Sequence, residues 1–332
     1  MNILLTGGAG YIGSHCTLEL IKRGHKVTVL DNLERGHQET LDSIMQLVGE
    51  FEFLKLDLRN LEELRNGLRD RQFDAVIHFA AYIDVGESVR EPAKYFENNV
   101  VGSQYLFQVL LENKVNNVIF SSSAAVYGTQ EIVPIPETAE KHPDSPYGET
   151  KLLMEMILEN YCQYSGMNAV ALRYFNPSGA EGNIGERHYP ETHAVPRVLK
   201  ALLDDNFTFG VFGDDYNTPD GSCIRDFIHI QDLVDAHIAC IDFLNTNKGF
   251  HAFNVATGKG TSVLELIKTA EEVSGRKLDY KIQSRREGDP AQLVADPTKI
   301  NTEIGWKAKY DIKDILKSAW EFEQKRPESD YH

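Results

Sequence analysis

The sequence is short of cysteine and of positive charge, and it has no long apolar run. Its four cysteines, Cys16, Cys162, Cys223 and Cys240, form no C-x-x-C pair and no spacing typical of metal ligands, which favours a reducing compartment. Lys and Arg number 34 against 50 Asp and Glu. The resulting net charge of −16 argues against nucleic acid and anionic membranes as partners, since both require a basic surface.

No apolar run approaches the roughly 18 residues of a membrane-spanning helix. The first strand-like run starts at residue 2 and leaves no room for a signal peptide, so we expect a cytoplasmic protein. With 332 residues, of which 42% are hydrophobic, the chain can bury a large core, and its length suggests two lobes.

The N-terminal segment combines a short apolar run at residues 2–6, a glycine-rich turn and a helical pattern at residues 12–23. Gly8, Gly10 and Gly13 match G-x-G-x-x-G, and Gly7 replaces Gly8 in the looser G-x-x-G-x-x-G. Either spacing lets the backbone approach a pyrophosphate at the start of the helix.

A second apolar run, residues 27–30, ends at Asp31, about 20 residues past the glycines, where a carboxylate binds the 2′-hydroxyl of a cofactor ribose. Asp31 would repel a 2′-phosphate, and no arginine follows it immediately. The sequence therefore predicts NAD rather than NADP as the cofactor.

Strand-like and helix-like segments alternate as far as about residue 176, which predicts an α/β fold with a doubly wound parallel sheet of the Rossmann type. Ligands bind beyond the carboxyl ends of such strands. After residue 176, loops rich in Gly, Pro and Asp suggest a smaller mixed α/β lobe. We expect a nucleotide-binding domain at residues 1–175, to which a segment at about 226–256 returns, and a substrate-binding domain at residues 176–332. The further strands are expected at 51–56, 75–79, 118–122 and 169–172, and the helices at 61–71, 92–113 and from 147 onward.

Tyr147 and Lys151 lie four residues apart in a helical pattern and so share one face of the helix. A free tyrosine has a pKa of about 10, and a cation beside it favours the phenolate and lowers that value. Tyr147 is therefore a candidate base. Taken alone, the pair is also compatible with a core phenol and a solvated charge.

Together these features resemble the extended short-chain dehydrogenase/reductase family, and within it the UDP-glucose 4-epimerases. The resemblance covers essentially the whole chain. It is carried by TGGAGYIGSH (6–15), HFAA (78–81), VGESV (85–89), NNVVG (98–102), SSSAAVYG (121–128), SPYGETK (145–151), LRYFNPSGA (172–180), PETH (190–193), FGDDY (212–216), DGSCIRDFIH (220–229) and RREGDP (285–290).

The resemblance implies that Ser123, Tyr147 and Lys151 are catalytic, with Tyr147 as the base. It implies that hydride passes from C4 of the hexose to NAD and returns to the other face of a 4-keto sugar, interconverting UDP-galactose and UDP-glucose. The implied contacts to NAD are Gly7, Gly10, Tyr11, Ile12, Gly13, Asp31, Asn32, Asp57, Leu58, Phe79, Ala80, Ala81, Asn98, Ser121, Tyr147, Lys151 and Tyr174.

For the substrate, Arg225 and Arg286 can bind a diphosphate through bidentate hydrogen bonds, and Phe212 offers a ring for a uracil. Each arginine taken singly is equally compatible with a surface salt bridge. The implied substrate contacts are Ser123, Tyr147, Phe175, Asn176, His193, Val195, Gly210, Phe212, Arg225, Phe227, Arg286, Asp289 and Leu293.

Ala124 and Ala125 stand where related dehydratases and decarboxylases carry carboxylates, which favours epimerisation over loss of water. An NAD-dependent nucleotide-sugar dehydrogenase and a non-catalytic nucleotide-binding protein remain alternatives. Leu293 stands where some relatives carry a tyrosine, which leaves UDP-GalNAc/UDP-GlcNAc interconversion open. Ile83 replaces a lysine or serine near the cofactor, so one contact to NAD is expected to be missing.

The resemblance also implies a homodimer through the helices at residues 92–113 and 147–164. His188, Glu191 and His193 lie close together in the sequence, but a Pro-containing loop without regular spacing does not predict a ligand geometry. We therefore expect no metal site there.

Overall fold

The structure, a computed structural model, describes residues 1–286 and 288–326. The chain divides into two compact units. The first comprises residues 1–128, 140–173 and 234–253, and the second comprises residues 129–139, 174–233 and those from 254 on. Each unit contains segments that are distant in the sequence.

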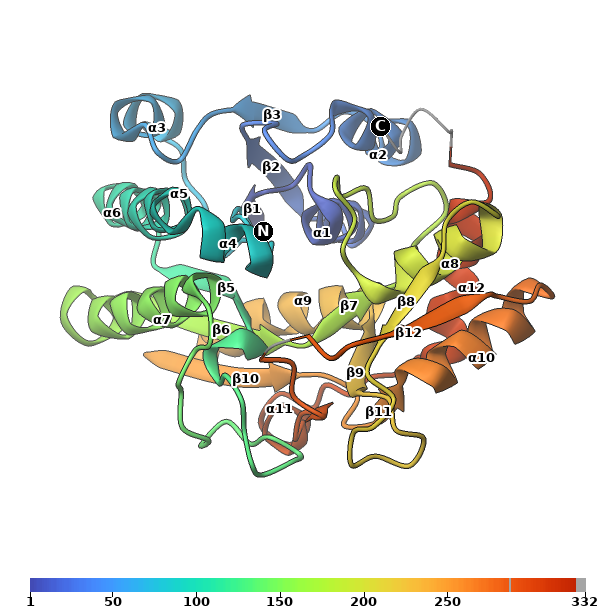
Figure 1. Cartoon of the computed structure of the whole chain (residues 1–332). Helices are drawn as coiled ribbons and strands as arrows, with labels where there is room; N and C mark the ends of the chain where they lie inside the picture. Colours follow the sequence, from blue (N-terminus) through green and yellow to red (C-terminus); the bar gives the residue numbers. More distant parts are fainter. Residues whose placement is uncertain (287, 327–332) are drawn as a thin grey trace. The chain divides into compact units, whose positions relative to one another are not determined.

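The first unit is built on a seven-stranded sheet with the order β10-β6-β5-β4-β1-β2-β3 (Figure 1). β1 pairs in parallel with β2 and β4, β2 with β3, and β4 with β5. The doubly wound α/β fold expected from the alternating pattern is confirmed. The strands are β1 (Asn2–Thr6), β2 (Lys26–Asp31), β3 (Glu52–Lys55), β4 (Ala75–His78), β5 (Asn117–Ser123), β6 (Asn168–Tyr174) and β10 (Phe250–Val255).

The strands β1, β2, β4 and β5 are buried along nearly their whole length, as strands of a parallel sheet are when helices cover its faces. Leu64 and Leu68 of α3, Phe107 of α6 and Leu158 of α7 belong to one buried apolar cluster with residues of the strands. The helical elements are α1 (Tyr11–Lys22), α2 (Gln38–Val48), α3 (Leu61–Leu68), α4 (Val85–Arg90), α5 (Pro92–Tyr95), the π-helix η1 (Phe96–Gly102), α6 (Ser103–Glu112), the 3₁₀ turn η2 (Ala124–Val126), α7 (Pro146–Ser165) and α9 (Ile230–Thr246).

The order of the strands places a switch point between β1 and β4, because the chain runs outward from β1 to β3 and then crosses back to β4. Ligands of open α/β sheets bind at such points, beyond the carboxyl ends of the strands. The ends of β1 and β4 meet at the glycine turn: Phe79 N donates to Thr6 O at 3.0 Å.

The second unit holds smaller sheets. β9 pairs with β11 in antiparallel and with β7 and β13 in parallel, and β8 pairs with β12 in parallel. Its apolar core joins α8, α10 and α12. The elements are β7 (Asn176–Ser178), α8 (Ala194–Leu203), β8 (Phe209–Phe212), β9 (Ile224–His229), β11 (Gly260–Ser262), α10 (Val263–Ser274), β12 (Tyr280–Gln283), β13 (Gln292–Leu293), α11 (Thr298–Glu303) and α12 (Ile312–Glu323).

Two local features, η1 and α2, differ from the expected elements. The helix expected over residues 92–113 is interrupted by the π-helical turn η1, a distortion that is frequent at functional sites. α2 was not expected from the sequence. Throughout the described part of the chain, every helix is too short or too polar to traverse a lipid bilayer.

Candidate active site

The turn between β1 and α1 requires glycine for steric reasons. Gly7 has φ +74°, and a Cβ there would lie 2.6 Å from the backbone nitrogen of Ala80. A Cβ on Gly13 would lie 2.1 Å from Gly7 O. Gly8 has a different task, since its Cβ would meet Val29 of β2 at 2.6 Å. The looser spacing, with Gly7, Gly10 and Gly13, is therefore the one that keeps side chains out of the turn itself.

This turn fits a dinucleotide pyrophosphate. Gly10 is the N-cap of α1 and offers no side-chain cap to the first backbone N–H groups of the helix. Such N–H groups, together with the helix dipole, form an anion site.

Asp31 ends β2 beside the same turn. Its Oδ2 accepts from Ala9 N at 3.0 Å and its Oδ1 from Leu33 N at 2.8 Å. Burial raises the pKa of Asp31, and these two backbone bonds oppose that effect. A carboxylate oxygen accepts more than one hydrogen bond, so Asp31 retains capacity for a ribose hydroxyl.

Asn32 and Asp57 lie together at the ends of β2 and β3, where Asn32 Nδ2 donates to Asp57 Oδ2 at 3.0 Å. Arg59 donates to both carboxylate oxygens of Asp57, at 2.9 and 2.6 Å. The bonds from Arg59 lower the pKa of Asp57 to about 2, although partial burial opposes them. Asp57 is therefore a fixed negative charge at neutral pH.

The π-helical turn carries Asn98, an expected cofactor contact, and Asn99, which the motifs did not single out. Asn99 accepts from Tyr82 N at 2.8 Å and donates to Tyr82 O at 3.0 Å and to Thr150 Oγ1 at 3.2 Å. Asn98 in turn donates to Asn99 Oδ1 at 3.0 Å. Asn99 thus fixes the segment after β4 against α7.

Ser123, Tyr147 and Lys151 come together where β5 ends and α7 begins. α7 starts at Pro146, capped by Ser145, whose hydroxyl accepts from Gly148 N at 3.2 Å. Ser123 forms a hydrogen bond with the Tyr147 phenol. Lys151 Nζ donates to Ser121 O at 2.7 Å and lies 5.8 Å from the centre of the Tyr147 ring.

Burial changes the expected electrostatics of this set. We expected the Lys151 cation to lower the pKa of Tyr147. Instead, burial raises the pKa of Tyr147 to about 12, and the hydrogen bond with Ser123 opposes that rise. Burial also lowers the pKa of Lys151 to about 7, against the opposing charge of Glu155. The task of Tyr147 as a base remains a prediction.

A buried ion pair lies one helical turn past Lys151. Arg173 donates to Glu155 through Nε at 2.9 Å and through Nη2 at 2.6 Å, and Ser122 Oγ also donates to Glu155 at 2.6 Å. Arg173 Nη1 donates to the hydroxyl of Tyr127 at 2.9 Å. Sequence reasoning missed Glu155, although its spacing of four from Lys151 places it on the same helix face.

In the second unit, two of the expected substrate contacts pair with each other. Arg225 Nη2 donates to Asp289 Oδ1 at 2.7 Å, and its Nη1 donates to Pro290 O at 3.0 Å. Leu293 of β13 lies opposite Arg225 of β9 in the sheet register. Asn176 donates to Asp226 O at 3.1 Å.

Arg286 stacks on Phe212, with its guanidinium carbon 3.7 Å from the centre of the ring. The ring expected to face a uracil is therefore covered by a cation in this structure. Gly210 lies two residues before Phe212 in β8, and a Cβ there would meet the Gln283 side chain at 2.8 Å. Val195 of α8 and Phe227 of β9 lie in the apolar core of this unit.

The sequence pattern predicted no ligand geometry for His188, Glu191 and His193, but the structure brings them into one compact cluster. Together with buried Glu186, their ligand-type atoms lie within 4.8 Å of one another. His188 and His193 approach Glu186 Oε1 at 2.9 and 2.8 Å, and His193 Nδ1 lies 2.8 Å from Glu191 Oε1. Burial alone would lower the pKa of His193, but the charges of Glu186 and Glu191 raise it well above its ordinary value. His193 thus lies between two carboxylates, and Glu191 Oε2 has no hydrogen-bond partner among the described residues. The expected absence of a metal site stays a prediction.

Comparison with known proteins identifies the fold and the family. Residues 3–256 match the model of the NAD dependent epimerase/dehydratase family. A UDP-glucose 4-epimerase from Lactobacillus helveticus is 43% identical over 331 residues, covering 98% of each chain.

Solved structures agree with this match. A UDP-glucose-4-epimerase from Stenotrophomonas maltophila, with bound NAD and formylated UDP-arabinopyranose, has a TM-score of 0.94 at 38% identity and covers 98% of each chain. A UDP-Glc/GlcNAc 4-epimerase from Campylobacter jejuni has a TM-score of 0.86 at 37% identity, covering 98% of this chain and 99% of that one. The resemblance carried by the motifs is confirmed, and so is NAD as the cofactor of the family. The chain belongs to the NAD dependent epimerase/dehydratase family.

Proposed function

We propose that this protein is an NAD-dependent UDP-glucose 4-epimerase, an isomerase that interconverts UDP-galactose and UDP-glucose through a 4-keto sugar. The observation that carries the proposal is that Ser123, Tyr147 and Lys151 come together where β5 ends and α7 begins, with Tyr147 and Lys151 buried, in the same unit as a glycine turn shaped for a dinucleotide. The similarity to UDP-glucose 4-epimerases along nearly the whole chain supports it.

NAD⁺, when bound, supplies reversible hydride transfer at C4 of the hexose and a positive charge. The residues that would hold it are those of the glycine turn with Asp31, Asn32 and Asp57. Tyr147 would take the proton of the C4 hydroxyl at its phenolic oxygen and return it. Two groups favour the phenolate: the Ser123 hydroxyl, through its hydrogen bond, and the Lys151 ammonium, whose charged form Glu155 supports.

The two alanines that follow Ser123 favour epimerisation over elimination of water from the sugar. Ala124 is buried and Ala125 packs against the cluster of Tyr82, Tyr95 and Tyr147. Removing water from the hexose would require a carboxyl acid or base at this end of β5, and these two positions provide none. The alanines do not by themselves separate an epimerase from a dehydrogenase, so the distinction needs a measurement.

For the nucleotide, we propose that Arg225, Arg286, Phe212 and Asp289 of the second unit bind the UDP group. An acidic protein needs arginines at the point where it binds a diphosphate. Arg286 now stacks on Phe212, and Asp289 now pairs with Arg225. We propose that UDP binds by displacing these contacts or by adding to them.

We propose as a second substrate the pair UDP-GalNAc and UDP-GlcNAc. Leu293 is aliphatic and only half-buried, so a bulky aromatic side chain does not narrow the substrate pocket at that position. Similarity to the UDP-Glc/GlcNAc 4-epimerase from Campylobacter jejuni supports this extension. Leu293→Tyr should then reduce turnover of the N-acetylated sugars and spare that of the plain ones.

We propose a cytoplasmic homodimer. The four cysteines are free, as a reducing compartment requires. Leu153, Met156 and Tyr164 form an exposed stripe along α7, which a second copy would cover. Light scattering should give twice the chain mass, and Met156→Glu should shift the protein towards the monomer.

The experiment that tests the function is to incubate the purified protein with UDP-galactose, without added cofactor, while following products by chromatography and NADH by absorbance. UDP-glucose without lasting NADH would support the epimerase. Steady accumulation of NADH after addition of NAD would identify a dehydrogenase instead, and binding without turnover would identify a non-catalytic protein.

A further inference from the structure

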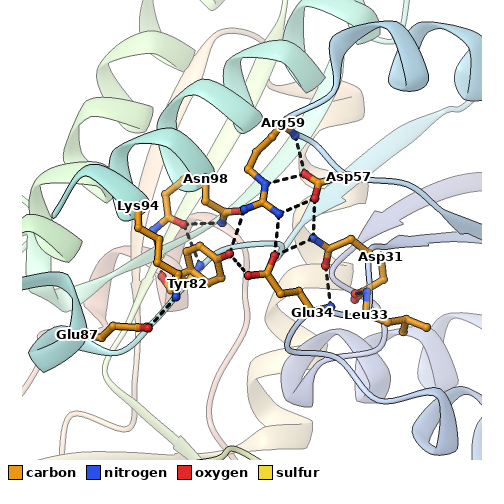
Figure 2. A network of polar contacts seen from close by, with 11 residues as sticks. Asp31, Leu33, Glu34, Asp57, Arg59, Tyr82, Glu87, Lys94 and Asn98 are labelled. Carbon is orange, nitrogen blue, oxygen red and sulfur yellow. Dashed lines mark hydrogen bonds and ion pairs between the residues drawn. The ribbon is translucent and has the colours of Figure 1, made fainter. Parts of the chain in front are cut away.

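Arg59 lies in a network at the ends of β2 and β3 (Figure 2). Its Nη2 lies 2.7 Å from Glu34 Oε2 and 2.6 Å from Asp57 Oδ2, and its Nη1 donates to the Tyr82 hydroxyl at 3.2 Å. The Tyr82 hydroxyl in turn donates to Glu34 Oε1. One guanidinium is thus held between two carboxylates and a phenol.

The network adjoins Asp31 through Asn32, the next residue in the chain. Asn32 Nδ2 donates to Asp57 Oδ2 at 3.0 Å and to Glu34 Oε2 at 3.4 Å. Arg59 is therefore anchored at the same edge of the sheet as Asp31. No arginine follows Asp31 immediately in the sequence, but the segment after β3 brings Arg59 to this edge from 28 positions farther along the chain.

An arginine beside the ribose is what a cofactor with a 2′-phosphate needs. In this structure, Glu34 and Asp57 neutralise Arg59. A second arginine, Arg35 in the loop between β2 and α2, pairs with both carboxylate oxygens of Glu87 at 3.0 and 3.2 Å. Both cations are bound to acids of the chain.

We propose that Glu34 is a specificity-determining residue, which holds Arg59 in an ion pair and so makes the site reject cofactors that carry a 2′-phosphate. The inference rests on the proposal that Asp31 faces the adenosine ribose. It adds a second acid, outside the glycine-and-aspartate motif, to the choice of NAD over NADP.

The charge state of the network suits this task. Partial burial alone would raise the pKa of Glu34, but the hydrogen bond from Tyr82 and the charge of Arg59 lower it. Burial and the Glu34 carboxylate raise the pKa of Tyr82 to about 12. At neutral pH, Glu34 is charged and Tyr82 remains a donor to it.

The test compares Glu34→Gln with a matched control, Glu112→Gln. Glu112 also pairs with an arginine, Arg65, at 2.9 Å, and its side chain is 43% exposed against 38% for Glu34. Each holoenzyme is dialysed against an equimolar mixture of isotope-labelled NAD⁺ and NADP⁺. Dialysis continues until no unlabelled NAD⁺, the original cofactor, remains bound. The bound nucleotides are then released and quantified by chromatography.

We expect Glu34→Gln to raise the bound NADP/NAD ratio about tenfold, the factor that one charge-assisted hydrogen bond to the 2′-phosphate would supply. Adding Arg59→Gln should abolish the gain, and Glu112→Gln should match the wild type. An unchanged ratio in Glu34→Gln would overturn the inference. If Asp31→Asn also left the ratio and the retention of NAD unchanged, the proposed position of the cofactor would itself be wrong.

Discussion

The ion pair between Glu155 and Arg173 lies one helical turn past Lys151 in α7. Removing one member of this pair should greatly lower the free energy of unfolding. Both side chains are almost fully buried and share two hydrogen bonds, at 2.9 and 2.6 Å. Arg173→Met keeps most of the side-chain volume but leaves the Glu155 carboxylate without its cation, although Ser122 Oγ still donates to it. Breaking a buried pair from one side costs about 3–5 kcal/mol, because an uncompensated charge stays in the interior.

The double variant Arg173→Met/Glu155→Met separates this effect from lost packing. Replacing both members of a buried pair by apolar groups of similar volume is often close to neutral. We therefore expect the double variant to recover most of the free energy of unfolding lost in Arg173→Met. Urea unfolding followed by circular dichroism, with saturating NAD in every sample, measures all variants.

Arg65→Met provides the control, because Arg65 pairs with Glu112 on the surface, where a salt bridge contributes about 0–1 kcal/mol. The reasoning is refuted if Arg173→Met costs no more than Arg65→Met. It is also refuted if the double variant is as unstable as the sum of the two single substitutions.

Three further predictions concern the proposed site and the His–Glu cluster. Tyr147→Phe should lower kcat by about 10²–10⁴-fold while UDP binding, measured by calorimetry, stays within error, since only the proton acceptor is removed. Lys151→Met should raise the free energy of unfolding by of the order of 4 kcal/mol at pH 7, because burial lowers the Lys151 pKa from 10.5 to about 7. Between these two pH values the folded wild type binds fewer protons than the unfolded chain, so the stability of the wild type rises with pH. The difference in free energy of unfolding between variant and wild type, measured in urea titrations, should therefore shrink by pH 10. Glu186→Gln should lower the melting temperature at pH 6 but make the fall in stability at acid pH less steep. Burial would raise the pKa of Glu186, but His193 and His188 outweigh burial and lower that pKa. The stabilising contribution of the Glu186 carboxylate is therefore present above about pH 4.5 and disappears as the pH falls.

Local sequence signals predicted the first half of the fold well. The strand, glycine turn, helix and Asp31 follow one another within residues 2–31, and each depends on its neighbours in the chain. The end of β5 and the start of α7 were also predicted to within one residue, from the apolar run at residues 118–122 and the helical pattern that starts at Tyr147.

What the sequence did not reveal depends on burial and on distant pairs. The net shift of the Tyr147 pKa is upward, where a lowering was expected, because the pattern gives the spacing of Tyr147 and Lys151 but not their loss of solvent. Arg225 and Asp289 pair across 64 positions, and Glu34 pairs with Arg59 across 25. No periodic pattern encodes such contacts.

The central claim is that hydride leaves C4 of the sugar and returns to the same carbon within one protein molecule. The most direct measurement uses UDP-galactose carrying deuterium at C4, with the purified protein in ordinary water and the product examined by NMR and mass spectrometry. The account predicts UDP-glucose that keeps the deuterium at C4 while no NADH accumulates. Loss of the deuterium to water, or its appearance in released NADH, would contradict it.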